Sequence, residues 1–162
     1  MGYDPERWHD AYVMLGSAAA ALTGLVFVGL SMHARAVAAD PYQRARARYL
    51  TAGLVYITVI SALVLVPGQG LDALGAELLF GGIAAGPIVA IPFVRFHDRM
   101  LPDVRIRLGV VAGAWALNVA AGISLLVHRG GGLYLLLPAM LLGIVMNVFG
   151  AWSLLLGLAR EE

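Results

Sequence analysis

The residues best suited to chemistry in this chain are neutral polar side chains set inside long apolar stretches. Thr51, Thr58 and Ser61 fall in one stretch, while Asn118 and Asn147 lie near the middle of two others. Hydroxyls and amides can replace the hydration water of a passing solute. They also join neighbouring membrane helices, at about 0.6 kcal/mol for each contact. The pattern therefore predicts either a polar path through a membrane or polar contacts between helices.

A second feature is a run of glycines and prolines in the third apolar stretch. It contains Gly82, Gly86, Pro87 and Pro92. A proline donates no backbone hydrogen bond, so the carbonyl four residues before it loses its partner. In lipid that carbonyl must face protein, a hydroxyl or water. Broken helices often line substrate or ion paths, although simple kinks are also common. We expect this helix to be bent or locally unwound between Gly82 and Pro92.

Carboxylates are missing from the apolar stretches, which argues against proton-coupled transport. Glu77 comes nearest, because it stands directly before the third stretch. A carboxylate near a helix N-terminus is stabilised by the helix dipole. We interpret Glu77 as such a helix-terminal residue.

Basic residues gather in two segments with the same pattern, in which a histidine precedes a proline and then paired arginines. His33 and His97 occupy matching positions in these segments. If the two faced each other they could bind a metal or haem; otherwise they meet the last carbonyls of a helix and lipid headgroups. We favour the second role and expect no metal and no cofactor. The residues assigned to an inner mouth or to headgroups are His33, Arg44, Arg46, Arg48, His97, Arg105 and Arg107.

The elements that carry these residues are five apolar helices. Of the 162 residues, 60% are hydrophobic and 13% are charged, against roughly 25% charged residues in an average soluble protein. Five stretches lack charged residues and histidine, and each approaches the about 20 residues that a helix needs to cross a bilayer. The sequence predicts an all-α, polytopic integral membrane protein with a single transmembrane domain over residues 1–162. The expected helices are at about 11–38, 41–67, 73–95, 104–127 and 133–159.

The distribution of arginine predicts the orientation. Nine of the eleven basic residues fall between the first and second helices, between the third and fourth, or at the C-terminus, whereas Arg7 and Arg129 lie on the other side. The positive-inside rule then places the N-terminus outside and the C-terminus in the cytoplasm. We expect a multi-pass protein of a bacterial plasma (inner) membrane. Its basic side would contact anionic lipid headgroups.

The matching basic segments predict an internal repeat. Residues 11–67 and 73–127 would be two hairpins of the same orientation, with the last helix added. Parallel repeats of this kind occur in membrane transporters. Alternatively, selection for arginine on the inner side and for prolines at helix starts produced the same pattern twice.

Small residues recur at helical spacing in four of the five expected helices, and such ridges let backbones approach closely. Their number exceeds what one small bundle needs, so we predict a homo-oligomer. The residues concerned are Gly16, Ala20, Gly24, Gly82, Gly86, Ala90, Gly109, Gly113, Gly143, Gly150 and Gly157.

Three hypotheses for function follow. The first is a small oligomeric permeation protein, a channel or passive facilitator for a small ion or polar solute. The second is a non-catalytic accessory or assembly protein that binds other membrane proteins. The third, a haem or quinone redox protein, rests on the histidines alone. We expect no enzymatic activity, because the loops are too short for a catalytic domain, and the net charge of +1 predicts no nucleic-acid partner.

Overall fold

The structure, a computed structural model, describes residues 4–95 and 102–158, except the side chains of residues 88, 89, 92, 93, 95, 102–104 and 107. His97 and the side chains of Pro92 and Arg107 are therefore outside the described part. Every regular element in these ranges is a helix. The elements are η1 (Pro5–Trp8), α1 (His9–Met32), α2 (Ala34–Ala39), α3 (Pro41–Val64), α4 (Leu71–Arg95), α5 (Pro102–Leu126) and α6 (Leu133–Leu158).

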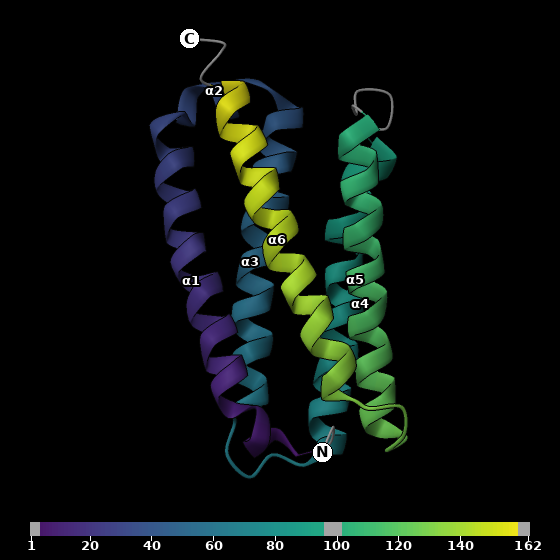
Figure 1. The fold of residues 1–162 in the computed structure, drawn as a ribbon. Helices are drawn as coiled ribbons and strands as arrows, with labels where there is room; N and C mark the ends of the chain where they lie inside the picture. Colours follow the sequence, from purple (N-terminus) through teal and green to yellow (C-terminus); the bar gives the residue numbers. More distant parts are fainter. Residues whose placement is uncertain (1–3, 96–101, 159–162) are drawn as a thin grey trace.

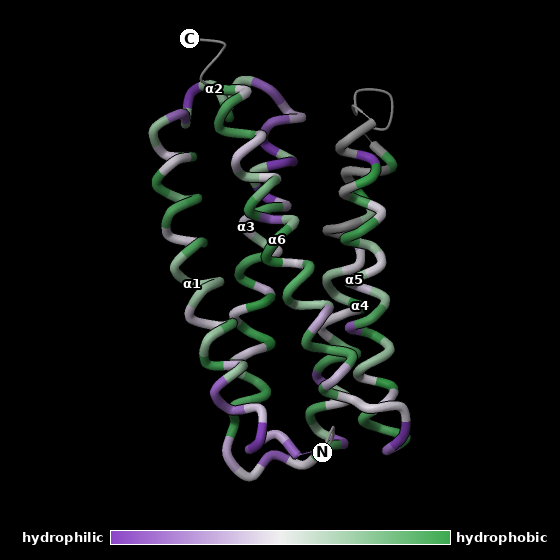
Figure 2. Tube along the Cα trace, in the orientation of Figure 1, coloured by the Kyte–Doolittle hydropathy of each residue, from purple (hydrophilic) through white to green (hydrophobic). Residues whose placement is uncertain are grey.

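Within the described residues, four helices are long and apolar enough to cross a membrane, which identifies a multi-pass helical membrane protein. They are Pro5–Met32, Pro41–Val64, Leu108–Leu126 and Leu133–Leu158. The remaining long helix, α4, matches the predicted third span, but several of its side chains lie outside the described part. Figure 2 shows hydrophilic residues gathered at the two ends of the bundle and hydrophobic residues along its length.

The long helices alternate in direction, and α6 joins two hairpins (Figure 1). One hairpin is α1 with α3, and the other is α4 with α5. We call the end that carries the N-terminus the lower end and the opposite one the upper end. The last helix crosses from α5 at the lower end to α3 at the upper end. In both hairpins the first long helix runs from the lower to the upper end; the internal repeat itself stays a prediction.

Two hydrophobic clusters hold the bundle, and they differ in which helices they join. The lower cluster draws on all five long helices and contains Tyr12, Leu15, Ala19, Ile57, Ile60, Val64, Leu74, Leu78, Ala121, Leu125, Leu133, Leu136 and Met140. Among the described residues, the upper cluster has buried members from α1, α3 and α6, and residues of α2 pack against it; the buried members are Val26, Ala47, Leu50, Leu54, Ala151, Leu154 and Leu158. In the described part of the chain, α4 and α5 thus contribute buried residues to the lower cluster and not to the upper one.

The first predicted helix, 11–38, is divided in two at its upper end. His33 has φ −107° and ψ 26° and separates α1 from α2. Its Nδ1 donates to the carbonyl oxygen of Gly29 at 3.1 Å, and its backbone N–H bonds the carbonyl of Ser31. Because the side chain takes the carbonyl that the backbone would use, the helical ladder stops there. The next helix begins as expected, with the Asp40 carboxylate accepting from the N–H of Tyr42 at 2.9 Å.

The local unwinding predicted between Gly82 and Pro92 is absent. Residues 71–95 form one continuous helix, α4. The physical reason is that each proline removes only one backbone hydrogen bond, and membrane helices tolerate this loss when neighbouring groups satisfy the freed carbonyl. Lower on the same helix, α4 meets α5 closely: a Cβ placed on Gly75 would lie 3.0 Å from the carbonyl oxygen of Gly122, and one placed on Gly122 would lie 3.1 Å from the carbonyl oxygen of Gly75. Small residues allow two backbones to approach in this way.

A short turn closes the lower end between α5 and α6. Gly130 and Gly131 have φ +89° and +95°, a conformation that side chains with a Cβ rarely adopt. The Ser124 hydroxyl donates to the carbonyl of Arg129 and accepts from the N–H of Gly132 at 2.9 Å. Nearby, the Tyr12 hydroxyl donates to the carbonyl of Leu133, which ties α1 to α6.

The two glycine environments on α5 give a first prediction. Gly122→Ala should lower the free energy of unfolding by about 1–3 kcal/mol, because the new Cβ meets the α4 backbone. Gly113→Ala is the matched control, because a Cβ at Gly113 meets nothing within 4 Å. It should be neutral or stabilising by up to about 1 kcal/mol, the difference in helix propensity. Circular dichroism during unfolding in mixed micelles measures the free energy of unfolding of both variants. Equal effects of the two substitutions would contradict the close contact of α4 with α5 at Gly122.

Candidate functional site

A cavity of about 590 Å³ lies between the two hairpins at mid-depth. It is walled by α3, α4, α5 and α6, and Ile57, Ile60 and Met140 of the lower cluster form part of its lining. Most of its lining is aliphatic or aromatic. The lining residues are Tyr49, Ala52, Gly53, Val55, Tyr56, Ile57, Val59, Ile60, Leu63, Glu77, Phe80, Gly81, Ala84, Ala85, Val111, Ala114, Trp115, Asn118, Ala139, Met140, Gly143 and Asn147.

The cavity opens sideways between α3 and α4. Val55, Val59 and Phe80 line it and are also exposed on the outside of the bundle, Phe80 by 77%. In a bilayer an opening with such a rim faces acyl chains. The cavity is thus accessible from lipid, as suits an apolar ligand.

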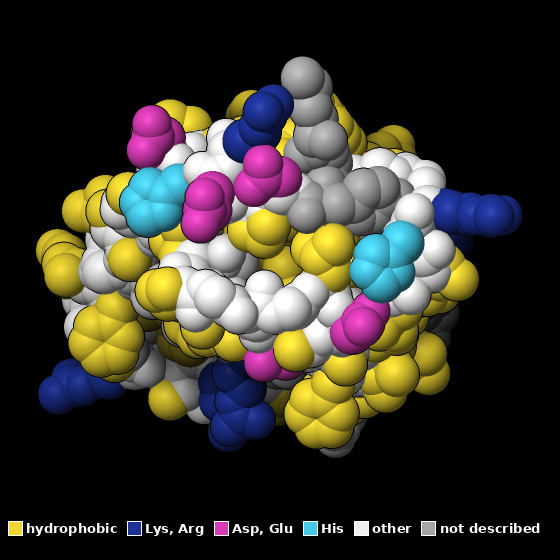
Figure 3. All heavy atoms as spheres, turned by 90° about the horizontal axis from the view of Figure 1, so that it is seen from below, with side chains coloured by type: hydrophobic (Ala, Val, Ile, Leu, Met, Phe, Trp, Pro, Cys, Tyr) yellow, Lys and Arg dark blue, Asp and Glu magenta, His cyan; other side chains and the backbone are white. Residues whose placement is uncertain are grey.

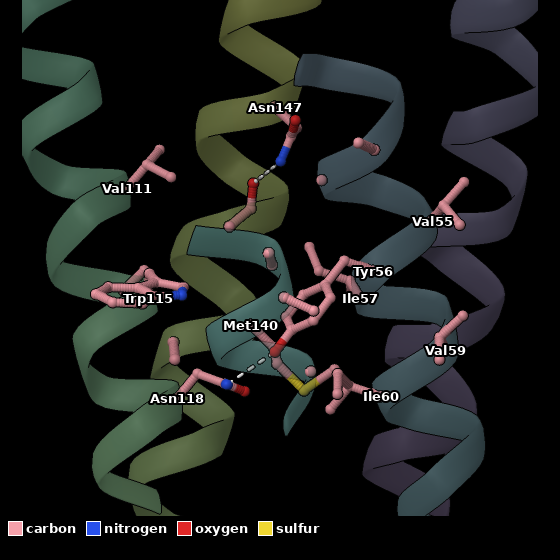
Figure 4. A pocket seen from close by; sticks show the side chains of 18 of the residues that line it. Val55, Tyr56, Ile57, Val59, Ile60, Val111, Trp115, Asn118, Met140 and Asn147 are labelled. Carbon is pink, nitrogen blue, oxygen red and sulfur yellow. Dashed lines mark hydrogen bonds between the residues drawn. The ribbon is translucent and has the colours of Figure 1, made fainter. Parts of the chain in front are cut away.

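Polar groups from α3, α4 and α5 meet in the middle of the cavity (Figure 4). Asn118 is 4% exposed, and its Nδ2 donates to the hydroxyl oxygen of Tyr56 at 2.8 Å and to the carbonyl of Leu78 at 3.4 Å. Trp115 Nε1 donates to the carbonyl of Gly82 at 2.7 Å. These bonds hold an amide, a phenol and an indole against the cavity wall.

Two glycines predicted to break α4 instead make room for Trp115. A Cβ on Gly86 would lie 3.3 Å from Cζ2 of Trp115, and one on Gly82 would lie 3.2 Å from Nδ2 of Asn118. The indole bond to the carbonyl of Gly82 also requires this close approach. Gly82 and Gly86 therefore act in the packing of α4 on α5.

The upper part of the cavity contains unmet hydrogen-bonding atoms. Asn147 is 5% exposed, and its Nδ2 donates to the carbonyl of Gly143 at 2.8 Å. The carboxamide lies flat against Gly53, where a Cβ would be 2.9 Å from Oδ1. Because the Gly143 carbonyl only accepts, the amide orientation is set and Oδ1 is left as a buried acceptor without a partner. The buried Tyr49 hydroxyl is also without one.

The lower end of the cavity carries its one lining carboxylate. Glu77 is half-buried, and its Oε2 accepts from Nε2 of Gln69, in the loop between α3 and α4, at 2.6 Å. The other amide atom of Gln69, Oε1, is buried without a partner. An amide turned the other way would direct Oε1 at the carboxylate, so the hydrogen bond fixes the orientation.

The hydroxyl residues predicted either to line a path or to join helices are not among the lining residues of the cavity. The Thr58 hydroxyl donates to the carbonyl of Leu54 in its own helix at 3.0 Å. Ser61 is buried at the contact of α3 with α1, with its Cβ 2.9 Å from the Cβ position of Gly16. Thr51 is half-buried and is not a lining residue of the cavity. Of the polar candidates, the cavity brings together Asn118 and Asn147.

The basic residues of the upper end stay near the surface. Arg44, Arg48 and Arg105 are exposed, and the guanidinium of Arg46 lies 5.7 Å from the centre of the Tyr42 ring. No group of three or more histidines and carboxylates within the described residues is placed to hold a metal ion.

No protein-family model, curated protein or solved structure matches this chain. The function is therefore inferred from the geometry of the cavity alone.

Trp115, Tyr56 and Glu77 line the cavity, although none of them is among the predicted path-lining or helix-packing residues. Trp115 and Tyr56 sit near the middle of apolar stretches, whereas aromatic belts place such residues at the membrane surfaces. That position was a usable signal of an internal role. Glu77 was interpreted as a helix-terminal residue, because a sequence cannot show that its side chain reaches the end of a cavity.

The contact of Asn118 with Tyr56 gives a second prediction. Asn118→Leu should lower the free energy of unfolding by about 1 kcal/mol, because it removes a buried hydrogen bond between α5 and α3. In a double-mutant cycle, Tyr56→Phe should couple to Asn118→Leu by about 0.6 kcal/mol or more. The control cycle pairs Asn118→Leu with Thr58→Val, since Thr58 bonds only its own helix. Additive effects in the first cycle would show that the bond does not form.

Proposed function

We propose that this protein is a non-enzymatic membrane protein that admits a small, mainly apolar molecule from the bilayer into its internal cavity and passively facilitates its movement. The observation that carries the proposal is the mid-depth cavity, apolar over most of its wall and open between α3 and α4. Its few polar groups are placed at its ends and centre, which is the pattern of a ligand site.

The size of the cavity supports a ligand and not structural water alone. A volume of about 590 Å³ lies within the range of roughly 300–1,000 Å³ typical of small-molecule sites. A void of this size without an occupant would cost the wall many contacts. Aliphatic chains or rings from lipid are suited to fill it, with their polar atoms beside the free acceptors.

The orientation we propose has five spans, with α4 as the third, the lower end outside the cell and the upper end in the cytoplasm of a bacterial inner membrane. The support is the asymmetry of charge. Figure 3 views the lower end and shows acidic and histidine side chains among hydrophobic ones, with arginine side chains toward the edge of the view. The upper end carries Arg35, Arg44, Arg46 and Arg48 on the first hairpin, where anionic headgroups would meet them.

Single cysteines test this orientation, since the chain has none of its own. A membrane-impermeant maleimide added to intact cells should label Gly70→Cys and Arg129→Cys, and should label Ala38→Cys and Arg105→Cys only after lysis. All four positions are exposed in the structure. If Gly70→Cys and Arg105→Cys were labelled from the same side, α4 would not span the membrane.

Occupancy of the cavity can be measured with Trp115 as the reporter. In a Trp8→Phe, Trp152→Phe background in lipid nanodiscs, a bromoalkanol should quench Trp115 fluorescence in a saturable manner, because bromine quenches on contact. Ala114→Phe should abolish saturable quenching, since Ala114 is buried and lines the cavity. Ala112→Phe is the matched control, because Ala112 is exposed and is not a lining residue.

A second reporter separates the cavity from the bilayer. In a Trp8→Phe, Trp115→Phe background, Trp152 is 66% exposed on the outer surface of α6 and reports probe dissolved in lipid. If quenching of Trp115 rose linearly with probe concentration, as quenching of Trp152 by probe in the bilayer does, the proposed function would be overturned.

The other hypotheses drawn from the sequence stay predictions. Passage of a small ion or polar solute is tested by chloride, potassium and proton flux into liposomes. A homo-oligomer, or an accessory role through contact with other membrane proteins, would use glycines with open space at the Cβ position: Gly24, Gly109, Gly113 and Gly157. An absorption spectrum of the purified protein tests for haem.

A further inference from the structure

The lower end of the cavity carries a carboxylate on its wall. Glu77 lines the cavity, and its carboxylate receives one hydrogen bond, from Nε2 of Gln69. Oε1 of the same Gln69 amide is buried and has no partner among the described residues. The second carboxylate oxygen of Glu77 accepts no hydrogen bond from a described residue, so a ligand group that meets Glu77 in the cavity must donate hydrogen bonds.

No described cation neutralises Glu77. At the same end of the bundle, Arg7 pairs with Asp4 at 3.1 Å and His128 lies 3.7 Å from Asp72. These two basic side chains are thus directed to other carboxylates. An ionisable residue on the wall of an intramembrane cavity is costly unless a partner of opposite charge meets it.

The remaining wall suits the apolar part of such a partner. Phe80 and Leu63 adjoin the lower end, and Tyr56 and Trp115 present aromatic rings further along. Aromatic faces attract cations as well as hydrocarbon. A ligand with an ammonium at Glu77 and an alkyl or aryl body along the cavity would satisfy both parts of the site.

Resting on the proposed function, we propose that the cavity selects lipophilic amines: the protonated nitrogen of the ligand binds the Glu77 carboxylate, and its apolar body fills the space between α3 and α5. An alkylammonium supplies both the positive charge and the N–H donors that a lining carboxylate can accept.

The test compares two probes that differ only in the polar group. A bromoalkylamine and a bromoalkanol of equal chain length are titrated against the Trp115 reporter in nanodiscs of zwitterionic lipid, with the Trp152 reporter as the bilayer reference. The amine should bind at least about tenfold more tightly than the alcohol, which corresponds to about 1.4 kcal/mol. Glu77→Gln should bring the two affinities together, since glutamine can still accept from Gln69 but carries no charge.

Controls separate charge from folding. Glu77→Asp keeps the carboxylate and should keep the preference for the amine, even if its affinity falls. Asp72→Asn is the matched control, because Asp72 is an exposed carboxylate on the same helix that does not line the cavity; it should bind both probes as the unmodified reporter protein does.

Two outcomes would overturn the proposal, and they are distinguishable. Equal affinity for amine and alcohol, or an amine preference that survives Glu77→Gln, would overturn selection by Glu77 while leaving the cavity as a ligand site. Saturable quenching by neither probe would overturn the proposed function, and this inference with it.

Discussion

The constraint on which this structure depends is that a polar atom among apolar helices must find its partner inside the protein. The hydroxyls of Thr23 and Thr58 find their partner within their own helices, by donating to the carbonyls four residues earlier. Longer side chains find their partner on another helix: Asn118 donates a hydrogen bond to Tyr56, and Trp115 donates one to the carbonyl of Gly82. Each of these bonds also fixes how two segments lie, because breaking one leaves a polar group in a medium without water.

The same constraint makes the unsatisfied atoms informative. Four buried side-chain atoms in the described residues have no partner: the Tyr49 hydroxyl, Ser61 Oγ, Gln69 Oε1 and Asn147 Oδ1. Tyr49 and Asn147 line the cavity, and Gln69 bonds a residue that does. Natural proteins leave few buried polar groups without partners. Three of these four atoms therefore belong to residues on or next to the cavity wall, whereas Ser61 lies at the contact of α3 with α1.

The fold was largely readable from the sequence, whereas the site was not. Apolar length and the Asp40 cap predict the helices, and these features are local. The break at His33 depends on one imidazole reaching the Gly29 carbonyl, and the close approach of α4 to α5 depends on Gly75 meeting Gly122 of another helix. Neither contact has a sequence signature. The hydroxyl-bearing residues were expected in a path because composition gives residue types; which way a helix turns them is decided by its neighbours.

Some glycines of the bundle make room for the polar side chains of the cavity. Gly53, Gly82 and Gly86 lie where a Cβ would meet Asn147, Asn118 or Trp115, so their absence of a side chain positions the polar groups of the cavity. The last helix, α6, crosses the bundle and does not follow either hairpin along its whole length. Because α6 leaves α5 for α3 on its way up the bundle, no single helix closes the space between the two hairpins. The cavity is thus a consequence of an odd helix packed between two hairpins, and its polar atoms mark where the chain has not filled it.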